Sequence, residues 1–96
     1  MKLPLISSYY PYSSDNYGAN NLMVNLENLT LWYSYKTIIA YQVGYDIYDI
    51  IVRKNDWSTT TGKHLNAINP DKSIRIDGEQ FEKQLMEVLK GHNLTE

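Results

Sequence analysis

The chain has 96 residues, of which 43% are hydrophobic and 21% charged, and its formal net charge is −2 at pH 7. This composition excludes a disordered chain, and the length leaves room for one domain only, residues 1–96. There is no cysteine, which excludes disulfide bonds, thiol catalysis and thiolate-bound metals.

Residues 1–21 are the first predicted element, a surface loop or arm. From Ser7 to Asn21 the chain is rich in tyrosine, serine and asparagine, and Pro11 and Gly18 add turn-forming residues. This mixture shows neither helical periodicity nor sustained strand alternation. We therefore expect no regular structure in this stretch.

Residues 22–54 favour β-strands. β-branched and aromatic residues are enriched over residues 29–35, 37–43 and 47–53, and a turn sequence separates the last two stretches. Alternation places four side chains on one face of the first stretch: Leu29, Leu31, Tyr33 and Tyr35. Residues 34–37 contain no strong turn residue, so either a turn or one long bent strand fits there. The sequence predicts an antiparallel meander.

Residues 58–90 are the predicted helical part. Ser58 or Thr59 can cap a short first helix, which ends near Pro70 because proline cannot continue the hydrogen-bond ladder. Three side chains share one side of this helix: Thr61, Leu65 and Ile68.

The second helix has signals at both ends. Asp77, with Gln80 three residues later, resembles a capping box, and Gly91 is a stop signal. An apolar stripe, which we expect to pack on one face of the sheet, consists of Phe81, Leu85, Val88 and Leu89. The predicted fold class is therefore α+β, a small antiparallel β-meander packed against two C-terminal helices.

The segment from Trp57 to Asn66 holds the densest cluster of functional groups. Hydroxyl side chains at a helix start accompany free backbone N–H groups, and Lys63 and His64 add charge, so we predict an anion site for phosphate or a partner carboxylate. A nucleotide-binding P-loop is excluded, because its first glycine and its final hydroxyl are replaced by Trp57 and His64. Alternatively, the hydroxyls only cap the helix and Lys63 is solvated. The candidate anion- or partner-binding residues are Trp57, Ser58, Thr59, Thr60, Lys63, His64 and Asn66.

The histidines indicate neither catalysis nor metal binding. The sequence places no serine or carboxylate beside His64, so we expect a surface histidine there and an unperturbed pKa. His64, His92 and the scattered acids have no metal-ligand spacing. We predict no catalytic residue, no metal and no cofactor.

Residues 53–75 are basic, with five cations against two acids. The predicted basic patch, which Lys63 extends, consists of Arg53, Lys54, Lys72 and Arg75. Together with strand aromatics such as Trp32 and Tyr35, these cations suggest a nucleic-acid-binding surface. The net negative charge opposes this hypothesis, and most strand aromatics are expected to serve the core.

Two segments, residues 34–41 and 57–66, resemble a group of short uncharacterised proteins from phages, archaeal viruses and plasmids. The most distinctive part is Trp-Ser-Thr-Thr-Thr-Gly-Lys-His-Leu-Asn, residues 57–66, and the resemblance covers roughly residues 29–89. It implies a mobile-element origin and no established activity or functional residue.

The leading hypothesis is a small non-enzymatic viral or mobile-element accessory protein that binds a host protein, for example an antidefence inhibitor. A nucleic-acid-binding protein using residues 53–75 is the alternative, and an enzyme that uses His64 ranks third. No apolar stretch reaches membrane-spanning length and no signal peptide is evident, so we expect no membrane contact and a location in the host cytoplasm. A homodimer is expected because so short a chain gains stability by sharing surface.

Overall fold

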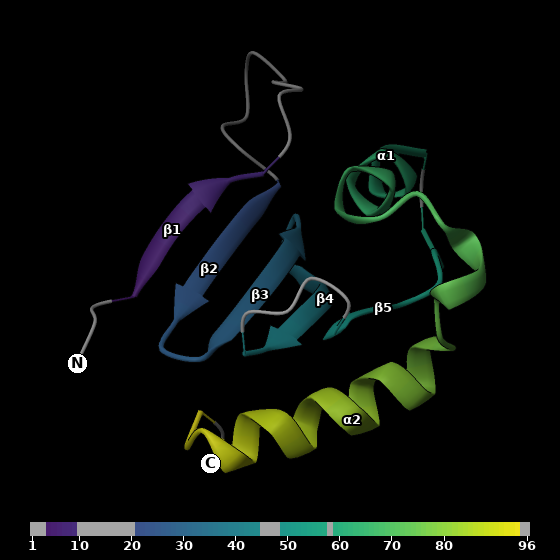
Figure 1. Ribbon diagram of the computed structural model, residues 1–96. Coiled ribbons are helices and arrows are strands. Elements are labelled where there is room, and N and C mark those ends of the chain that lie inside the picture. Colours follow the sequence, from purple (N-terminus) through teal and green to yellow (C-terminus); the bar gives the residue numbers. More distant parts are fainter. Residues whose placement is uncertain (1–3, 10–20, 45–48, 58, 95–96) are drawn as a thin grey trace.

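The computed structural model describes residues 4–9, 21–44, 49–57 and 59–94. Five antiparallel strands form one sheet in chain order: β1 (Leu5–Ser8), β2 (Leu22–Leu26), β3 (Leu29–Ser34), β4 (Thr37–Val43) and β5 (Ile50–Val52). Two α-helices, α1 (Thr59–Ile68) and α2 (Gly78–Gly91), follow the sheet, with a short 3-10 turn (Lys72–Ile74) between them (Figure 1). The predicted α+β fold, a meander with two C-terminal helices, is confirmed.

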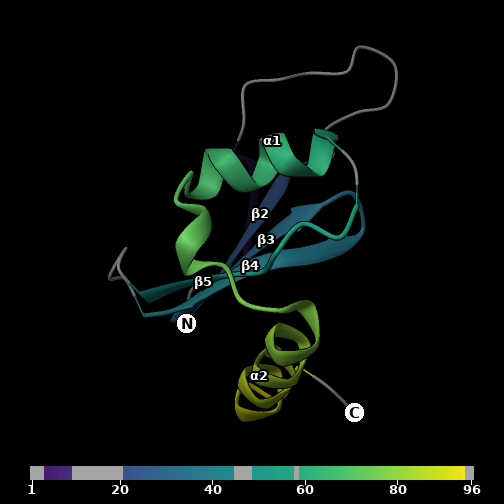
Figure 2. The same ribbon diagram turned by 90° about the vertical axis from the view of Figure 1, so that its right-hand side faces the viewer.

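The two helices cover opposite faces of the sheet, which gives three layers (Figure 2). On the α2 side, Phe81 and Leu85 join a buried cluster with strand residues Leu29, Leu31 and Tyr41. On the α1 side, Leu65 joins a second cluster, with Trp32, Ile39, Ala40 and Val52. The central strands therefore bury both faces, as β3 does along most of its length.

A β-bulge shapes the α1 side of β4. Tyr33 pairs with Ile38 and Trp32 pairs with Ala40, so Ile39 is an extra residue in the ladder. The bulge allows two consecutive side chains, Ile39 and Ala40, to enter the same cluster instead of alternating between faces. The Ile39 carbonyl accepts a hydrogen bond from the backbone N–H of Arg53, at 3.1 Å.

A two-residue turn joins β3 to β4. Ser34 pairs with Thr37, so Tyr35 and Lys36 form the connection, and the alternative of one long bent strand is wrong. Tyr35 has a φ of 56°, in the left-handed region that a bulky side chain rarely adopts. The turn therefore lacks the glycine or asparagine by which such turns are usually recognised.

The N-terminal stretch is partly strand. Residues 5–8 pair with β2, and the backbone N–H of Tyr9 continues the contact by donating to the Asn21 carbonyl at 3.1 Å. The prediction that residues 1–21 form a loop or arm is therefore wrong for residues 5–8, while residues 1–3 and 10–20 lie outside the described residues. All four β1 side chains are exposed, so this strand is held by its backbone hydrogen bonds to β2. For the same reason its sequence shows no alternation of apolar and polar residues.

After α1 the chain returns to the open side of β5. Lys54 N–H donates to the Ile76 carbonyl at 2.8 Å, and Ile76 N–H donates to the Val52 carbonyl at 2.9 Å. A parallel bridge between Arg53 and Ile76 results, and α2 begins next to it. Arg53 therefore lies where the sheet, the loop before α1 and the start of α2 meet.

The sequence predicts the start of α2 correctly but not its end. Asp77 is the N-cap as predicted, and its carboxylate accepts from the Glu79 N–H at 3.2 Å. Gly91 is the last helical residue and not the stop signal, because Asn93 takes the left-handed conformation (φ 59°) that ends the helix. The predicted stripe is confirmed: Phe81 and Leu85 are buried, and Val88 and Leu89 pack against them.

Candidate functional site

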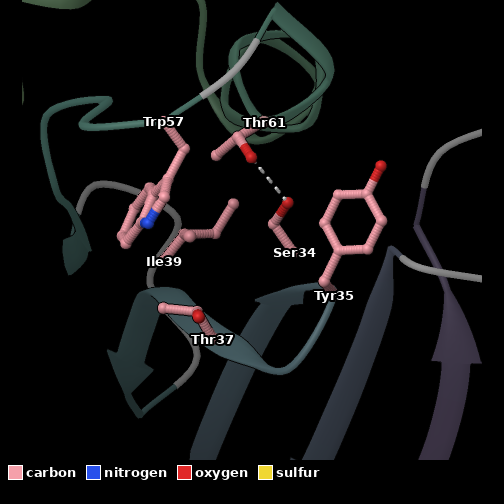
Figure 3. Close-up of a pocket in the computed structure, with 6 residues that line it drawn as sticks. All are labelled: Ser34, Tyr35, Thr37, Ile39, Trp57 and Thr61. Carbon is pink, nitrogen blue, oxygen red and sulfur yellow. Dashed lines mark hydrogen bonds between the residues drawn. The ribbon is translucent and has the colours of Figure 1, made fainter.

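A pocket of about 270 Å³ lies on the α1 side of the sheet. Its lining residues come from the β3–β4 turn, from β4, from the loop before α1 and from α1 itself: Ser34, Tyr35, Thr37, Ile39, Trp57 and Thr61. Figure 3 shows the rings of Trp57 and Tyr35 on opposite sides, with Ile39 and Ser34 between them. Segments 34–39 and 57–61, which the sheet and α1 bring together, thus form one concave surface with two aromatic walls.

The Trp57 wall is held by an arginine. Trp57 is 49% exposed, and the guanidinium carbon of Arg53 lies 4.5 Å from its ring centroid, a cation–π contact. Arg53 is buried and donates to Asp56 at 3.0 Å and to Glu82, on α2, at 3.1 Å. The Trp57 backbone N–H donates to the Asn55 side chain at 2.9 Å. The ring is therefore fixed by its own loop and, through Arg53, by α2.

Gly78 leaves room for that arginine. A Cβ atom added at Gly78 would overlap Arg53 Nη2 and would lie 2.9 Å from Asp56 Oδ2. Gly78 is the first residue of α2, so any larger residue at the start of this helix would push the guanidinium away from its carboxylate partners. The glycine thus contributes to the position of Trp57 without touching the pocket.

The Tyr35 wall belongs to the turn between β3 and β4. Tyr35 is 50% exposed, and its ring centroid lies 6.1 Å from that of His64. Figure 3 shows the ring beside Ser34, on the side of the pocket opposite Trp57. Unfavourable backbone conformations, such as the left-handed one of Tyr35, are frequent at ligand-binding sites.

A buried polar cluster supports the pocket from behind. Ser34 Oγ lies 2.7 Å from His64 Nδ1 and 3.2 Å from Thr61 Oγ1. The His64 ring also meets the Tyr9 ring edge-on, with 6.1 Å between centroids, and the Tyr9 hydroxyl donates to the Tyr33 carbonyl at 2.7 Å. These contacts tie α1 to the end of β3 and to the residue that follows β1.

His64 is only 2% exposed, so the prediction of a surface histidine is wrong. Burial lowers the pKa of its imidazole below the ordinary value of 6.5. The helical spacing does indicate that His64 is buried, because His64 follows the buried Thr61 by three residues and directly precedes the core residue Leu65. The serine partner that the sequence could not supply is Ser34, which lies thirty residues earlier.

A sequence family described as a family of unknown function, DUF8033, matches residues 4–83. The chain belongs to this family. The match includes all five strands and α1 and ends within α2, so it extends further toward the N-terminus than the resemblance over residues 29–89. No curated protein and no solved structure shows significant similarity to the chain.

In this DUF8033 protein, the two arginines of the predicted basic patch are buried. Arg53 is paired with carboxylates, and Arg75 donates to the Asn66 side chain at 2.9 Å and to the Asn69 carbonyl at 3.3 Å. The prediction that both arginines contact phosphates from the surface is therefore wrong. The lysines of the same segment, Lys54, Lys63 and Lys72, are exposed.

The other candidates of the DUF8033 chain are dispersed. Among the described residues of the predicted set, only Trp57 lines the pocket, while Thr59 is exposed, Thr60 is half-buried and Asn66 binds Arg75. Ser58 lies outside the described residues. In the part of the chain that the structure describes, no three histidine or carboxylate side chains gather as a metal site, and no helix is long and apolar enough to cross a membrane.

The buried imidazole predicts a dependence of stability on pH. Folded His64 has a lowered pKa, so between that value and 6.5 the unfolded chain binds more protons than the folded one. The stabilisation from neutral His64 should be complete above pH 6.5 and should be lost as the pH falls below it, with a slope of at most about 1.4 kcal/mol per pH unit.

Urea titrations between mildly acidic and neutral pH measure this slope. His64→Gln should remove the part of the slope that arises in this window. His92→Gln, the same substitution at the end of α2, measures separately how much of the slope the other histidine contributes. An unchanged slope in His64→Gln would show that the imidazole does not titrate differently in the folded chain.

Proposed function

We propose that this protein is a small non-enzymatic accessory protein of a virus or mobile genetic element, and that it acts in the host cytoplasm by binding a host protein. The observation that carries the binding role is the pocket between Trp57 and Tyr35, two residues that are about half exposed. Exposed tryptophan and tyrosine beside a small pocket are typical of the centres of protein interfaces, where one partner inserts an anchoring side chain. An inhibitor of a host defence protein belongs to this class.

The origin and location rest on different support. The resemblance of residues 34–41 and 57–66 to phage, archaeal-virus and plasmid proteins favours a mobile element. The apolar stretches of the sequence are too short to span a membrane, which fits the cytoplasm.

A nucleic-acid-binding role has less support. Arg53 and Arg75 are buried against Asp56, Glu82 and Asn66, which removes two of the five cations of residues 53–75 from the surface. Affinity for nucleic acid depends mainly on surface cations that neutralise phosphates, so this loss weakens the hypothesis directly.

An enzymatic role also has less support, although Ser34 and His64 are in contact. A nucleophilic serine needs a base at hydrogen-bonding distance and access to substrate. The distance of 2.7 Å meets the first requirement, but Ser34 is only 3% exposed and its hydroxyl also bonds Thr61. We assign the pair to the attachment of α1.

The test is an affinity pull-down from host-cell lysate with wild-type protein, Trp57→Ala and Met86→Ala as baits, each with and without nuclease. Met86 is an exposed apolar residue on α2, across the sheet from the pocket, and is the matched control. We expect a protein retained by wild type and Met86→Ala, resistant to nuclease, and bound about 30-fold more weakly by Trp57→Ala, as for an interface anchor.

Three results would overturn the proposal. Loss of the captured protein after nuclease treatment would indicate that nucleic acid is the true ligand. Labelling of Ser34 by a fluorophosphonate, a reagent for activated serines, would indicate an enzyme. Equal capture by wild type and Trp57→Ala would remove the pocket from the interface.

A further inference from the structure

The size of the pocket limits its occupant. Its volume of about 270 Å³ lies just below the roughly 300–1,000 Å³ of ordinary small-molecule sites. A dinucleotide or another large cofactor would not be enclosed. One side chain carrying a ring system would fill most of the space and would contact both aromatic walls.

The Trp57 wall disfavours a cation. A cation over an aromatic ring is attracted by the negative face of the π-system. In this protein, the Arg53 guanidinium, paired with Asp56 and Glu82, already lies 4.5 Å from the Trp57 ring centroid, so the attraction of the indole for a cation is already used by Arg53. A neutral ring does not depend on that attraction and can stack on the indole or meet its edge.

The pocket residues other than Trp57 and Tyr35 contribute an apolar side chain and three hydroxyl groups. Ile39, which the β-bulge places in the pocket, is the floor between the rings. The hydroxyls of Ser34 and Thr61 line the same space but are buried and bonded to each other, whereas Thr37 is half-buried and its hydroxyl oxygen has two acceptor lone pairs. This combination suits a ring that carries a hydrogen-bond donor, such as a phenol or an indole.

Two exposed lysines are close in the sequence to residues that line the pocket. Lys36 is exposed and lies between two lining residues, Tyr35 and Thr37, in the β3–β4 turn. Lys54 is also exposed and precedes Trp57 by three residues in the same loop. The acid nearest to Trp57 in the sequence, Asp56, already binds Arg53. Charge complementarity therefore favours a negatively charged group beside the inserted ring.

We propose that the pocket binds the side chain of a tyrosine or tryptophan that lies next to an aspartate or glutamate in the partner protein. This inference rests on the proposed function and names the ligand chemistry of the same site. The ring occupies the space between Trp57 and Tyr35, and the neighbouring carboxylate lies near Lys36. A nucleobase beside a phosphate has related features, so the experiment must separate the two.

The experiment is an NMR titration of the full isotope-labelled chain with blocked tripeptides and a short oligonucleotide. The probes are Asp-Tyr-Asp, Lys-Tyr-Lys and Asp-Leu-Asp tripeptides, and oligothymidylate. We expect Asp-Tyr-Asp to shift the Trp57 indole N–H and the backbone amides of Tyr35, Thr37 and Thr61. We expect the other three probes to bind more weakly or not at all.

Variants test each part of the site. Trp57→Ala should abolish the shifts, and Trp57→Phe, which keeps a ring, should retain part of the affinity. Lys36→Gln should weaken Asp-Tyr-Asp binding about two- to fivefold, the effect of one exposed ion pair. Lys83→Gln, the same change on the exposed side of α2, is the matched control and should have no effect.

The outcomes distinguish this inference from the proposed function. Equal binding of Asp-Leu-Asp and Asp-Tyr-Asp would overturn the preference for a ring, and tighter binding of Lys-Tyr-Lys would overturn the charge argument. Preferential binding of oligothymidylate at the pocket would favour nucleic acid. If no tripeptide binds while the lysate protein still depends on Trp57, the ligand chemistry is wrong and the proposed function stands.

Discussion

Phe81→Ala should lower the free energy of unfolding by about 3–5 kcal/mol, the usual effect of removing a buried phenylalanine ring. Phe81 has no exposed surface and lies in the centre of the α2-side cluster. Its ring is 5.5 Å from that of Tyr41, and the Arg53 guanidinium lies 5.6 Å from it. Truncation would leave a cavity between the sheet and α2 that neither of these neighbours can fill without leaving its own contacts.

Urea denaturation measures this loss. The free energy of unfolding of a small domain is about 5–15 kcal/mol, so this loss is a large fraction of it and should lower the denaturation midpoint substantially. The matched control is Met86→Ala, which shortens an exposed side chain of the same helix and should change stability by about 0.5 kcal/mol or less. Similar midpoints for the two variants would contradict the packing of α2 on the sheet.

Gly78→Ala should destabilise the protein by about 1–3 kcal/mol, the usual effect of overpacking, although alanine is the better helix former by about 1 kcal/mol. The added methyl would displace the Arg53 guanidinium from Asp56 and Glu82. Because the same guanidinium supports the indole of Trp57, the substitution should also change tryptophan fluorescence and weaken binding at the pocket.

Gly91→Ala is the matched control for this prediction. Gly91 lies in the last turn of the same helix, and an added Cβ would meet nothing within 4 Å. It should therefore raise stability by up to about 1 kcal/mol, the opposite sign. In an Arg53→Met background, the loss caused by Gly78→Ala should shrink, since the overlapping group is gone. If Gly78→Ala destabilises the Arg53→Met variant as much as it does the wild type, the added methyl group clashes with a residue other than Arg53.

The elements that could be predicted from the sequence are those whose burial follows a local period. The stripe of α2 repeats with helical spacing, and the first strand of the meander alternates, so Phe81, Leu85, Leu29 and Leu31 were placed correctly. β1 has no such period because none of its side chains is buried. Its position depends on backbone hydrogen bonds to β2, which any residue except proline can make.

The site was harder to predict because it depends on contacts between distant segments. Trp57 was a candidate from the sequence, but its opposite wall, Tyr35, was expected on a strand face with Leu29, Leu31 and Tyr33. The bulge at Ile39 and the turn at Tyr35 are set by the pairing of β3 with β4, and neither carries a glycine signal. The sequence shows Asp56 three residues after Arg53 but gives no sign of the second partner, Glu82, which is 29 residues away, and so it predicts a surface cation.

The turn at Tyr35 has a consequence for engineering. A left-handed φ at a non-glycine residue costs about 1–2 kcal/mol, and glycine would avoid most of this strain. A laboratory selection for thermostability alone would therefore tend to replace Tyr35 and would delete one wall of the pocket. Screening for heat resistance alone would then yield folded variants that no longer bind the ligand. A screen that selects for both heat resistance and binding would retain the Tyr35 ring.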